Sequence, residues 1–372
     1  MSEQVTPTPP LQVEGEAEVT FDLGIDLNKI RDMLRQARER RTGSGDERIC
    51  TMNLVAAFFS AESYERAQPA LEAAGTLHPA RLLVLIAEQG RPGDHVRGQV
   101  SVVRSGSSVA LERIVLEASG KAVRHLESAM LGLLVPELPV VFVWGGRPEG
   151  SLFDHVLENG DRVLIDSGTR PLDALVQIAR RVEAGAPIGD IAWARIFPWQ
   201  ATAADMLDLP NLREHRGRIQ AVRVTTAGAP GAEAALLAGW FQSRVKKAKV
   251  SLVEGPMPTA EQAAPPETKV AAAAHAPPLR PGHITSLVFE APPAAFSIRR
   301  EKNILIAEVK GDDDGEVVHR VRLPAEVPGR LLGLELKLLS GHDELYADAL
   351  IAAGKLVGPP APSSPASEAH NR

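Results

Sequence analysis

One short segment of this chain combines a histidine and an arginine at the start of an apolar run. His78 and Arg81 belong to the sequence HPAR, and the run that follows begins at Leu82. Ligands of α/β proteins commonly bind at the edge of the sheet, where loops meet strands. Charged donors there could contact a phosphate group, so His78 and Arg81 are candidate ligand-binding or partner-contact residues.

A second segment, residues 190–200, contains Trp193, Arg195 and Trp199. Trp and Arg are enriched among the residues that dominate protein–protein binding, so all three are candidate partner-contact residues. Buried tryptophans are also common in protein cores. The residue types therefore favour the interpretation that both tryptophans anchor the core and that Arg195 pairs with an internal carboxylate, with partner contact as the alternative.

Signatures of catalysis and cofactor binding do not occur in the sequence. It has no G-x-x-x-x-G-K-[ST] phosphate loop, no G-x-G-x-x-G after a strand and no G-x-S-x-G nucleophile turn. A single cysteine cannot form a thiolate zinc site, and the histidines are scattered. The acidic run 312–315 lies between predicted strands and predicts a hairpin turn, not a calcium loop. We expect no catalytic, cofactor-binding or metal-binding residues.

Composition and charge narrow the class of protein. The chain has 372 residues, a formal net charge of −6 and one cysteine, Cys50. The acidic balance argues against a nucleic-acid binder, and one cysteine excludes an intrachain disulfide and fits a reducing compartment. The apolar runs are too short to span a bilayer, and no signal peptide is visible. These features predict a cytoplasmic protein.

The order of apolar runs predicts an α/β main domain over residues 25–254. Continuous apolar strands that alternate with amphipathic segments indicate a three-layer mixed sheet with helices on both faces. The predicted strands are 52–59, 82–87, 140–144 and 162–165, a hairpin over 96–116, and two further strands near 219–224 and 250–252.

Pro- and Ala-rich composition predicts a linker over residues 255–282. Beyond it, strands near 284–289, 296–300, 304–309 and 317–323 and two helices predict a smaller α+β domain over 283–356 with an antiparallel meander. Residues 1–24 and 357–372 are predicted to be disordered tails, because they are rich in Pro, Glu, Thr and Ser.

The ordered series of segments resembles the OpcA family of glucose-6-phosphate dehydrogenase assembly factors. The blocks that carry the resemblance are HPARLLVL (78–85), LLVPELPVVFVWGG (133–146), DRVLIDS (161–167), GDIAWARIFPWQ (189–200), HITSLVFE (283–290) and DELYADAL (343–350). The resemblance implies a cytoplasmic, non-catalytic partner that binds glucose-6-phosphate dehydrogenase, promotes its assembly and activation as an allosteric effector, and so controls the oxidative pentose phosphate pathway. NADP would then belong to the partner enzyme. Photosynthetic members are linked to thiol regulation, but one cysteine excludes an internal disulfide switch here.

Two other functions remain open from the sequence. The first is an enzyme that acts on, or a protein that binds, a phosphorylated sugar near His78 and Arg81. The second is a nucleic-acid binder that uses the basic helix predicted over residues 28–41, which the acidic net charge opposes.

Overall fold

The structure is a computed structural model. It describes residues 11–21, 25–39, 50–75, 77–88, 92–105, 108–210, 212–263, 278–310, 316–324, 327, 329–338 and 343–358. The predicted turn at 312–315, half of the predicted linker (residues 264–277) and nearly all of the predicted C-terminal tail lie outside the described residues.

The chain divides into two compact units. The first unit comprises Met1–Ile165 and Pro328–Gly341, and the second comprises Asp166–Val327 and His342–Arg372. The last part of the chain thus contributes one helix to each unit.

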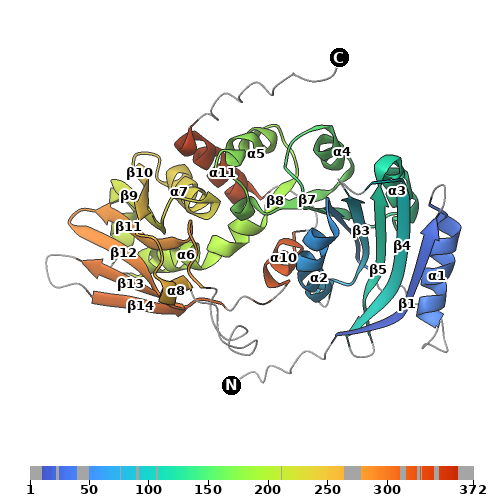
Figure 1. Ribbon diagram of the computed structural model, residues 1–372. Coiled ribbons are helices and arrows are strands. Elements are labelled where there is room, and N and C mark those ends of the chain that lie inside the picture. The colour runs from blue at the N-terminus through green and yellow to red at the C-terminus, as the bar shows by residue number, and fades with distance from the viewer. Residues whose placement is uncertain are drawn as a thin grey trace, which may run out of the picture. The chain divides into compact units, whose positions relative to one another are not determined.

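The first unit is built on a mixed sheet that contains the predicted parallel strands (Figure 1). Its strands are β1 (Leu11–Phe21), β2 (Met52–Phe58), β3 (Ala80–Glu88), β4 (His95–Ser105), β5 (Ser108–Ser119), β6 (Val140–Trp144) and β7 (Arg162–Ile165). In the sheet they follow the order β1-β4-β5-β3-β2-β6-β7. The parallel pairs are β5–β3, β3–β2, β2–β6 and β6–β7. Strand β4 pairs antiparallel with both β5 and β1.

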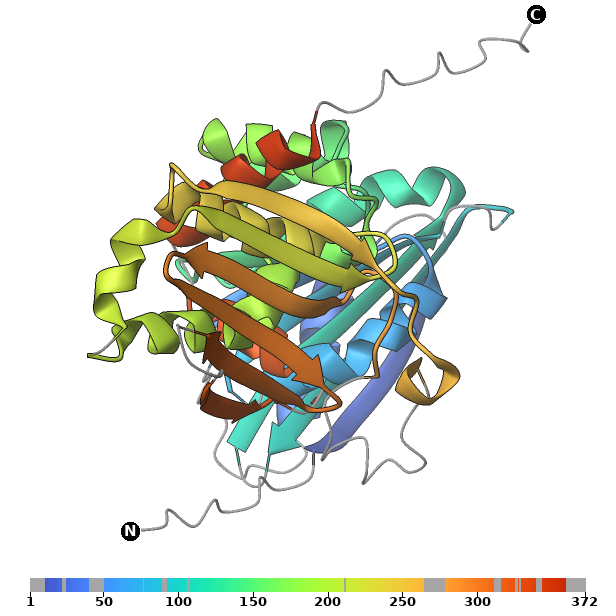
Figure 2. The same ribbon diagram turned by 90° about the vertical axis from the view of Figure 1, so that its left-hand side faces the viewer.

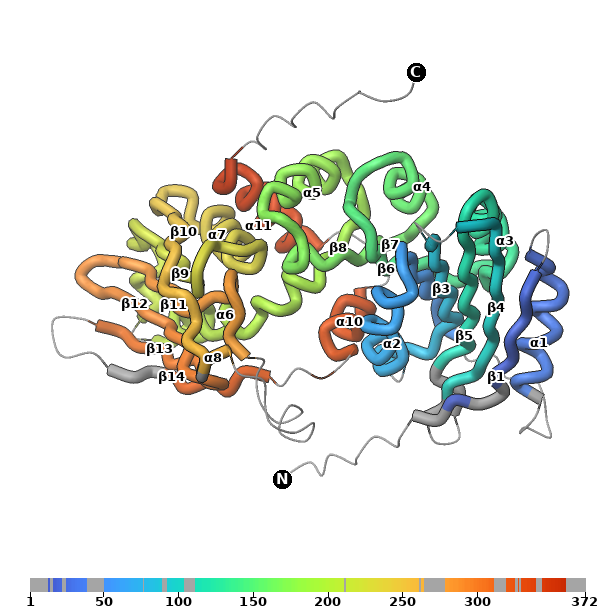
Figure 3. The backbone as a smooth tube through the Cα atoms, viewed as in Figure 1, coloured from blue at the N-terminus to red at the C-terminus, as the bar shows by residue number. Residues whose placement is uncertain are grey.

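Helices cover both faces of this sheet, so the predicted three-layer α/β fold is confirmed (Figure 3). They are α1 (Leu27–Glu39), α2 (Ala61–Gly75), the 3-10 turn η1 (Gly120–Arg124), α3 (His125–Leu133), α4 (Ser151–Asn159) and α10 (Arg330–Glu335). Neighbouring side chains of β3 distinguish the two faces: Leu85 lies with α3 and α4, and Ile86 lies with α2.

The prediction of a disordered tail over residues 1–24 is wrong for residues 11–21, which form β1 beside β4. Apolar and polar residues alternate in LQVEGEAEVTF, with a register shift between Glu14 and Ala17. This alternation buries Val19 and Phe21 and leaves Glu18 exposed. The composition of residues 1–24 does not reveal this pattern, whose period is two residues.

The second unit contains a six-stranded sheet that includes the predicted antiparallel meander, which is confirmed. Its strands are β9 (Ala221–Ala227), β10 (Lys249–Gly255), β11 (Ile284–Ala291), β12 (Ala294–Glu301), β13 (Ile304–Lys310) and β14 (Glu316–Arg322). They follow the order β10-β9-β11-β12-β13-β14. The core includes the rings of Phe289 and Phe296, which stack with centroids 4.8 Å apart.

The other elements of this unit are β8 (Ile188–Asp190), η2 (Ser167–Thr169), α5 (Ala174–Glu183), α6 (Ile191–Asp208), η3 (Arg213–Arg218), α7 (Ala232–Arg244), α8 (Ala260–Ala263) and α11 (Glu344–Val357). Helices α6 and α7 contact strands of the six-stranded sheet. Figure 2 shows that these helices lie behind the sheet, whose other face is turned to the viewer.

The division at Asp166 differs from the predicted boundary at residues 255–282. Strand β9 precedes that segment and β11 follows it, yet the two strands pair antiparallel in one sheet. Helix α10, which was predicted within the domain at 283–356, packs against α2 in the first unit. Pro- and Ala-rich composition marks a connection between elements, but it does not indicate whether the strands on either side pair.

Candidate functional site

His78 and Arg81 both contact the protein itself within the first unit. Nε2 of the half-buried His78 lies 3.0 Å from the carbonyl oxygen of Gly333. Arg81, only 8% exposed, donates from Nε and Nη2 to Oε2 of Glu112 at 3.0 and 2.8 Å. Its Nη1 donates to the carbonyl oxygen of Leu133 at 3.0 Å. Because every guanidinium nitrogen has an acceptor, this geometry does not favour Arg81 as a phosphate ligand.

The carboxylate of Glu112 is the centre of this buried charge cluster. Glu112 stands opposite Arg81 in the β3–β5 register, and its Oε1 lies 2.6 Å from Nε of Arg38. Burial acts to raise the pKa of Glu112, but Arg81 and Arg38 outweigh burial and lower it. Burial, with the charge of Glu112, raises the pKa of the half-buried Cys50 thiol to about 12, which disfavours the reactive thiolate form.

The candidates at 190–200 have different environments on α6. Trp199 is 5% exposed and belongs to the core, while Trp193 and Arg195 are half-buried. The most exposed large apolar side chain of the segment is Phe197, at 62%. The structure therefore supports the core interpretation for Trp199. The aromatic side chain that solvent reaches most is that of Phe197, which was not among the candidates from the sequence.

Arg195 is held between two carboxylates of the second unit. Its Nη2 lies 2.8 Å from Oδ2 of Asp166, and its Nη1 lies 2.8 Å from Oε1 of Glu233. Burial opposes the charge of Arg195, but the two carboxylates outweigh burial and raise the pKa of the guanidinium. A Cβ at Gly168 would lie 2.6 Å from Nη1 of Arg195, so a larger residue at this position would displace the guanidinium. As the alternative interpretation anticipated, Arg195 pairs with internal carboxylates.

Asp190 connects three elements beside this pair. Its side chain is completely buried, and Oδ1 accepts hydrogen bonds from the backbone N–H groups of Ser167 (3.0 Å) and Ala192 (2.9 Å). The hydroxyl of Tyr346 donates to Oδ2 at 3.4 Å. The ring of Tyr346 in turn packs 5.8 Å from that of Trp193, measured between centroids. Asp190 therefore joins η2, the start of α6 and α11.

Asp343 completes the connection between α6 and α11. It caps α11 by accepting from the N–H groups of Leu345 and Tyr346, and Nε1 of Trp193 donates to its Oδ2 at 3.1 Å. Trp193 is thus a structural link within the second unit, with its indole N–H already bonded.

We expect Asp190→Asn to change how stability depends on pH. Burial, together with the nearby charge of Asp166, raises the pKa of Asp190 from 3.8 to about 7, although hydrogen bonds from Ser167 oppose this shift. Between about pH 4 and pH 7 the folded state therefore binds more protons than the unfolded state, and the free energy of unfolding falls as pH rises. The asparagine side chain of the variant would keep one acceptor oxygen without titrating.

Urea unfolding of both proteins at several pH values measures this effect. The difference in unfolding free energy, variant minus wild type, should increase steadily from pH 4.5 to pH 7.5. Parallel pH profiles for the two proteins would contradict the assigned buried, titrating carboxyl.

The N-terminus of α2 is occupied by the protein's own side chains. Strand order reverses at β2, which has β3 on one side and β6 on the other, and in doubly wound folds a phosphate group of a nucleotide commonly binds at the helix that follows such a strand. Here the N–H of Ala61 donates to Oε1 of Glu88 at 2.6 Å, and Ser63 N–H donates to Oγ of Ser60 at 3.2 Å. A carboxylate therefore stands where an anionic ligand would bind.

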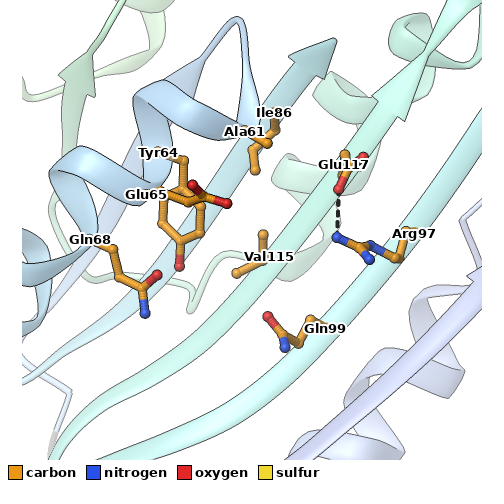
Figure 4. A pocket seen from close by; sticks show the side chains of 9 residues that line it. All are labelled: Ala61, Tyr64, Glu65, Gln68, Ile86, Arg97, Gln99, Val115 and Glu117. Carbon is orange, nitrogen blue, oxygen red and sulfur yellow. Dashed lines mark hydrogen bonds and ion pairs between the residues drawn. The ribbon is translucent and has the colours of Figure 1, made fainter. Parts of the chain in front are cut away.

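A polar groove lies beside the same helix, between α2 and the strands β3, β4 and β5 (Figure 4). Tyr64, Glu65 and Gln68 of α2 line it on one side. From the sheet, Arg97 reaches Glu117, with Nη2 2.9 Å from Oε2. The charge of this arginine is balanced by a protein carboxylate, which disfavours the groove as an anion site.

In the part of the chain that the structure describes, no group of three or more His, Cys, Asp or Glu residues is arranged to hold a metal ion. None of the described helices combines the length and apolar character needed to cross a membrane.

Comparison with protein families accounts for most of the sequence. Residues 71–181 match the family model described as the glucose-6-phosphate dehydrogenase subunit N-terminal domain. Residues 186–350 match the model described as the C-terminal domain of the same subunit. Both models represent OpcA, and together they cover more than half of the chain. The chain belongs to the OpcA family.

Curated relatives with the OpcA name match shorter regions. An OxPP cycle protein OpcA from Synechocystis sp. is 29% identical over 147 residues, which are 38% of this chain and 31% of that protein. The OpcA protein of Nostoc punctiforme is 28% identical over 184 residues, 47% of this chain and 39% of that protein. This chain therefore spans only about a third of the length of the OpcA relatives that it matches.

Solved structures show a weaker likeness. KijD10, a 3-ketoreductase from Actinomadura kijaniata in complex with NADP and TDP-benzene, matches 82% of this chain and 96% of its own with a TM-score of 0.43 and 14% identity. A Gfo/Idh/MocA family oxidoreductase from Vibrio cholerae matches with a TM-score of 0.33 and 11% identity, over 82% of this chain and 96% of that one. Scores this low support no shared activity.

Four of the blocks that resemble OpcA contribute to the charge cluster of the second unit. They supply Asp166, Asp190, Arg195, His283 and Tyr346. Burial and the positive charges of Arg300, Arg280 and Arg195 lower the pKa of His283 to about 4, so this imidazole is neutral at pH 7. Only Arg195 of these five residues was a candidate from the sequence, although all five lie in the quoted blocks. Asp166 directly follows the apolar run that ends at Ile165.

Proposed function

We propose that this chain is a non-catalytic, cytoplasmic partner of glucose-6-phosphate dehydrogenase that promotes assembly of the active enzyme. The observation that carries the proposal is the pair of family matches, which lie on both units and describe domains of a glucose-6-phosphate dehydrogenase subunit. The relatives named for the OxPP cycle agree with a role in oxidative pentose phosphate metabolism. An effector of this kind acts by binding the active state of its partner better than the inactive state.

In this proposal the chain itself binds no cofactor, and the geometry of the first unit supports this part of the proposal. Glu88 binds the N-terminus of α2, where a bound nucleotide would place phosphate, and the two negative groups would repel each other. Arg81, the cation expected to bind phosphate in a phosphosugar site, is neutralised by Glu112. NADP and glucose 6-phosphate accordingly belong to the partner enzyme in this proposal.

A direct experiment mixes the purified chain with its cognate dehydrogenase. The chain alone should form no NADPH from glucose 6-phosphate and NADP. Added to the dehydrogenase at substrate concentrations below KM, it should raise the rate of NADPH formation, co-elute with the enzyme and increase the enzyme's oligomeric mass. An unrelated protein at equal concentration controls for crowding.

Two results would refute the proposal. NADPH formation by the chain alone would make it an enzyme. The proposed interaction would be excluded if the two proteins did not co-elute at micromolar concentration and the chain left the rate of the dehydrogenase unchanged.

A further inference from the structure

The first unit contains an apolar cavity of about 220 Å³ that the proposed function does not use. It lies between α3 and α4, over the end of β2 and beside the carboxyl halves of β3 and β6. The crevice outside the carboxyl ends of the strands, near the point where strand order reverses, is where α/β sheets commonly bind ligands. Because this cavity is on the face opposite α2, it is distinct from the helix N-terminus that Glu88 occupies.

The inner wall of the cavity is aromatic. Phe58, Phe142 and Trp144 line it from the sheet, and each is at most 5% exposed. Nε1 of Trp144 already donates to the carbonyl oxygen of Arg147 at 2.8 Å, so the indole needs no polar partner in the cavity. The ring pairs with Phe153, with centroids 5.4 Å apart, which fixes its orientation.

Two leucines at the mouth of the cavity remain exposed to solvent. Leu131 of α3 is 50% exposed and Leu152 of α4 is 49% exposed, and both line the cavity. An occupant that contacted both side chains would remove this apolar surface from water. The arrangement therefore suits a molecule with an apolar body.

Polar side chains at the mouth of the cavity determine which polar group the bound molecule could carry at its other end. Nε2 of His155 on α4 lies 2.5 Å from Oε1 of Glu127 on α3, so these two side chains are paired across the opening. Arg124 also lines the cavity and is exposed, and no carboxylate of a described residue forms an ion pair with it. A cation beside an apolar chamber recognises a carboxylate attached to an apolar group.

We propose that this cavity binds a small aromatic monocarboxylate, with the ring system on Phe142 and Trp144 and the carboxylate on Arg124. The size is consistent with this class, since an apolar cavity of ~150 Å³ holds benzene and the larger volume here leaves room for a fused bicyclic ring of ~10 carbon atoms. The inference does not depend on the dehydrogenase partnership.

The test measures binding of 2-naphthoate to the full chain by isothermal titration calorimetry. Wild type should bind 2-naphthoate and, more weakly, the uncharged 2-naphthamide. Leu152→Trp fills the mouth of the cavity and should weaken 2-naphthoate binding at least ~tenfold. Arg124→Gln should weaken the carboxylate about tenfold and leave the amide unchanged, because only the carboxylate uses the cation.

The matched control is Val13→Trp, at a strand position of the first unit that is 48% exposed and does not line the cavity. It should bind 2-naphthoate as wild type does, and all variants should melt at the wild-type temperature. The inference is overturned by absence of 2-naphthoate binding at millimolar concentration, by wild-type affinity in Leu152→Trp, or by equal loss of both probes in Arg124→Gln. Loss of dehydrogenase association in Leu152→Trp without any 2-naphthoate binding would also overturn it and assign the cavity to a protein partner.

Discussion

Replacing Glu112 by glutamine is expected to lower the free energy of unfolding by ~3–5 kcal/mol. Glu112 is 2% exposed and balances the charges of Arg81 and Arg38. Glutamine keeps the shape of the side chain but removes its charge, so two largely buried guanidinium groups lose their counter-ion. Breaking a buried ion pair by neutralising one partner costs far more than the pair contributes as a whole, because the remaining charge stays desolvated.

Chemical unfolding at pH 7 measures this loss, and Glu127→Gln is the matched control. Glu127 also pairs with a basic side chain, His155, but both side chains are 49% exposed, so the change should cost less than ~1 kcal/mol. Equal decreases in the free energy of unfolding of Glu112→Gln and Glu127→Gln would contradict the assignment of Glu112 as a buried counter-ion.

The effect of Glu112→Gln should also depend on pH. The folded protein lowers the pKa of Glu112 from its ordinary 4.5, so the stabilisation is fully present above pH 4.5 and is lost as pH falls through the folded pKa. The difference in unfolding free energy between wild type and Glu112→Gln should therefore become smaller as the pH falls below 4.5. A difference that stays constant below pH 4 would exclude a titrating carboxylate as its cause.

Individual strands of the first unit could be predicted from the sequence, because the residue pattern within each strand is enough to identify it. The apolar runs at 140–144 and 162–165 coincide with β6 and β7, because an apolar run is a local property. The division of the chain depends instead on pairing between distant segments. The contact of β9 with β11 joins residues on both sides of the predicted linker, and no local pattern encodes that choice.

The candidate site shows the same limit at the level of side chains. The residue type of Arg195 indicated either a partner contact or an internal ion pair, and only the positions of Asp166 and Glu233 decide between them. Trp199 and Phe197 are two residues apart on one helix, yet one is buried and the other is exposed. The helical period separates their directions by about 200°, but the face that meets the core depends on the tertiary fold.

The exposed and buried aromatic residues of α6 permit a test of the partner-contact hypothesis for residues 190–200, which rests on the proposed function. Phe197→Ala removes a side chain that is 62% exposed, so the free energy of unfolding should change by less than ~0.5 kcal/mol. If Phe197 is a central contact with the dehydrogenase, its loss should weaken association by ~2 kcal/mol, about thirtyfold.

Trp199→Ala should give the opposite pair of results. Trp199 is 5% exposed, and its truncation leaves a cavity that should lower the free energy of unfolding by ~3–5 kcal/mol. Its association with the dehydrogenase, measured well below the lowered melting temperature, should remain near that of wild type, since the side chain does not reach the surface. Calorimetric melting and titration against the dehydrogenase measure both quantities for both variants. Wild-type affinity in Phe197→Ala at unchanged stability would exclude this face of α6 from the interface, because Phe197 is the large apolar side chain of the segment that a partner can reach.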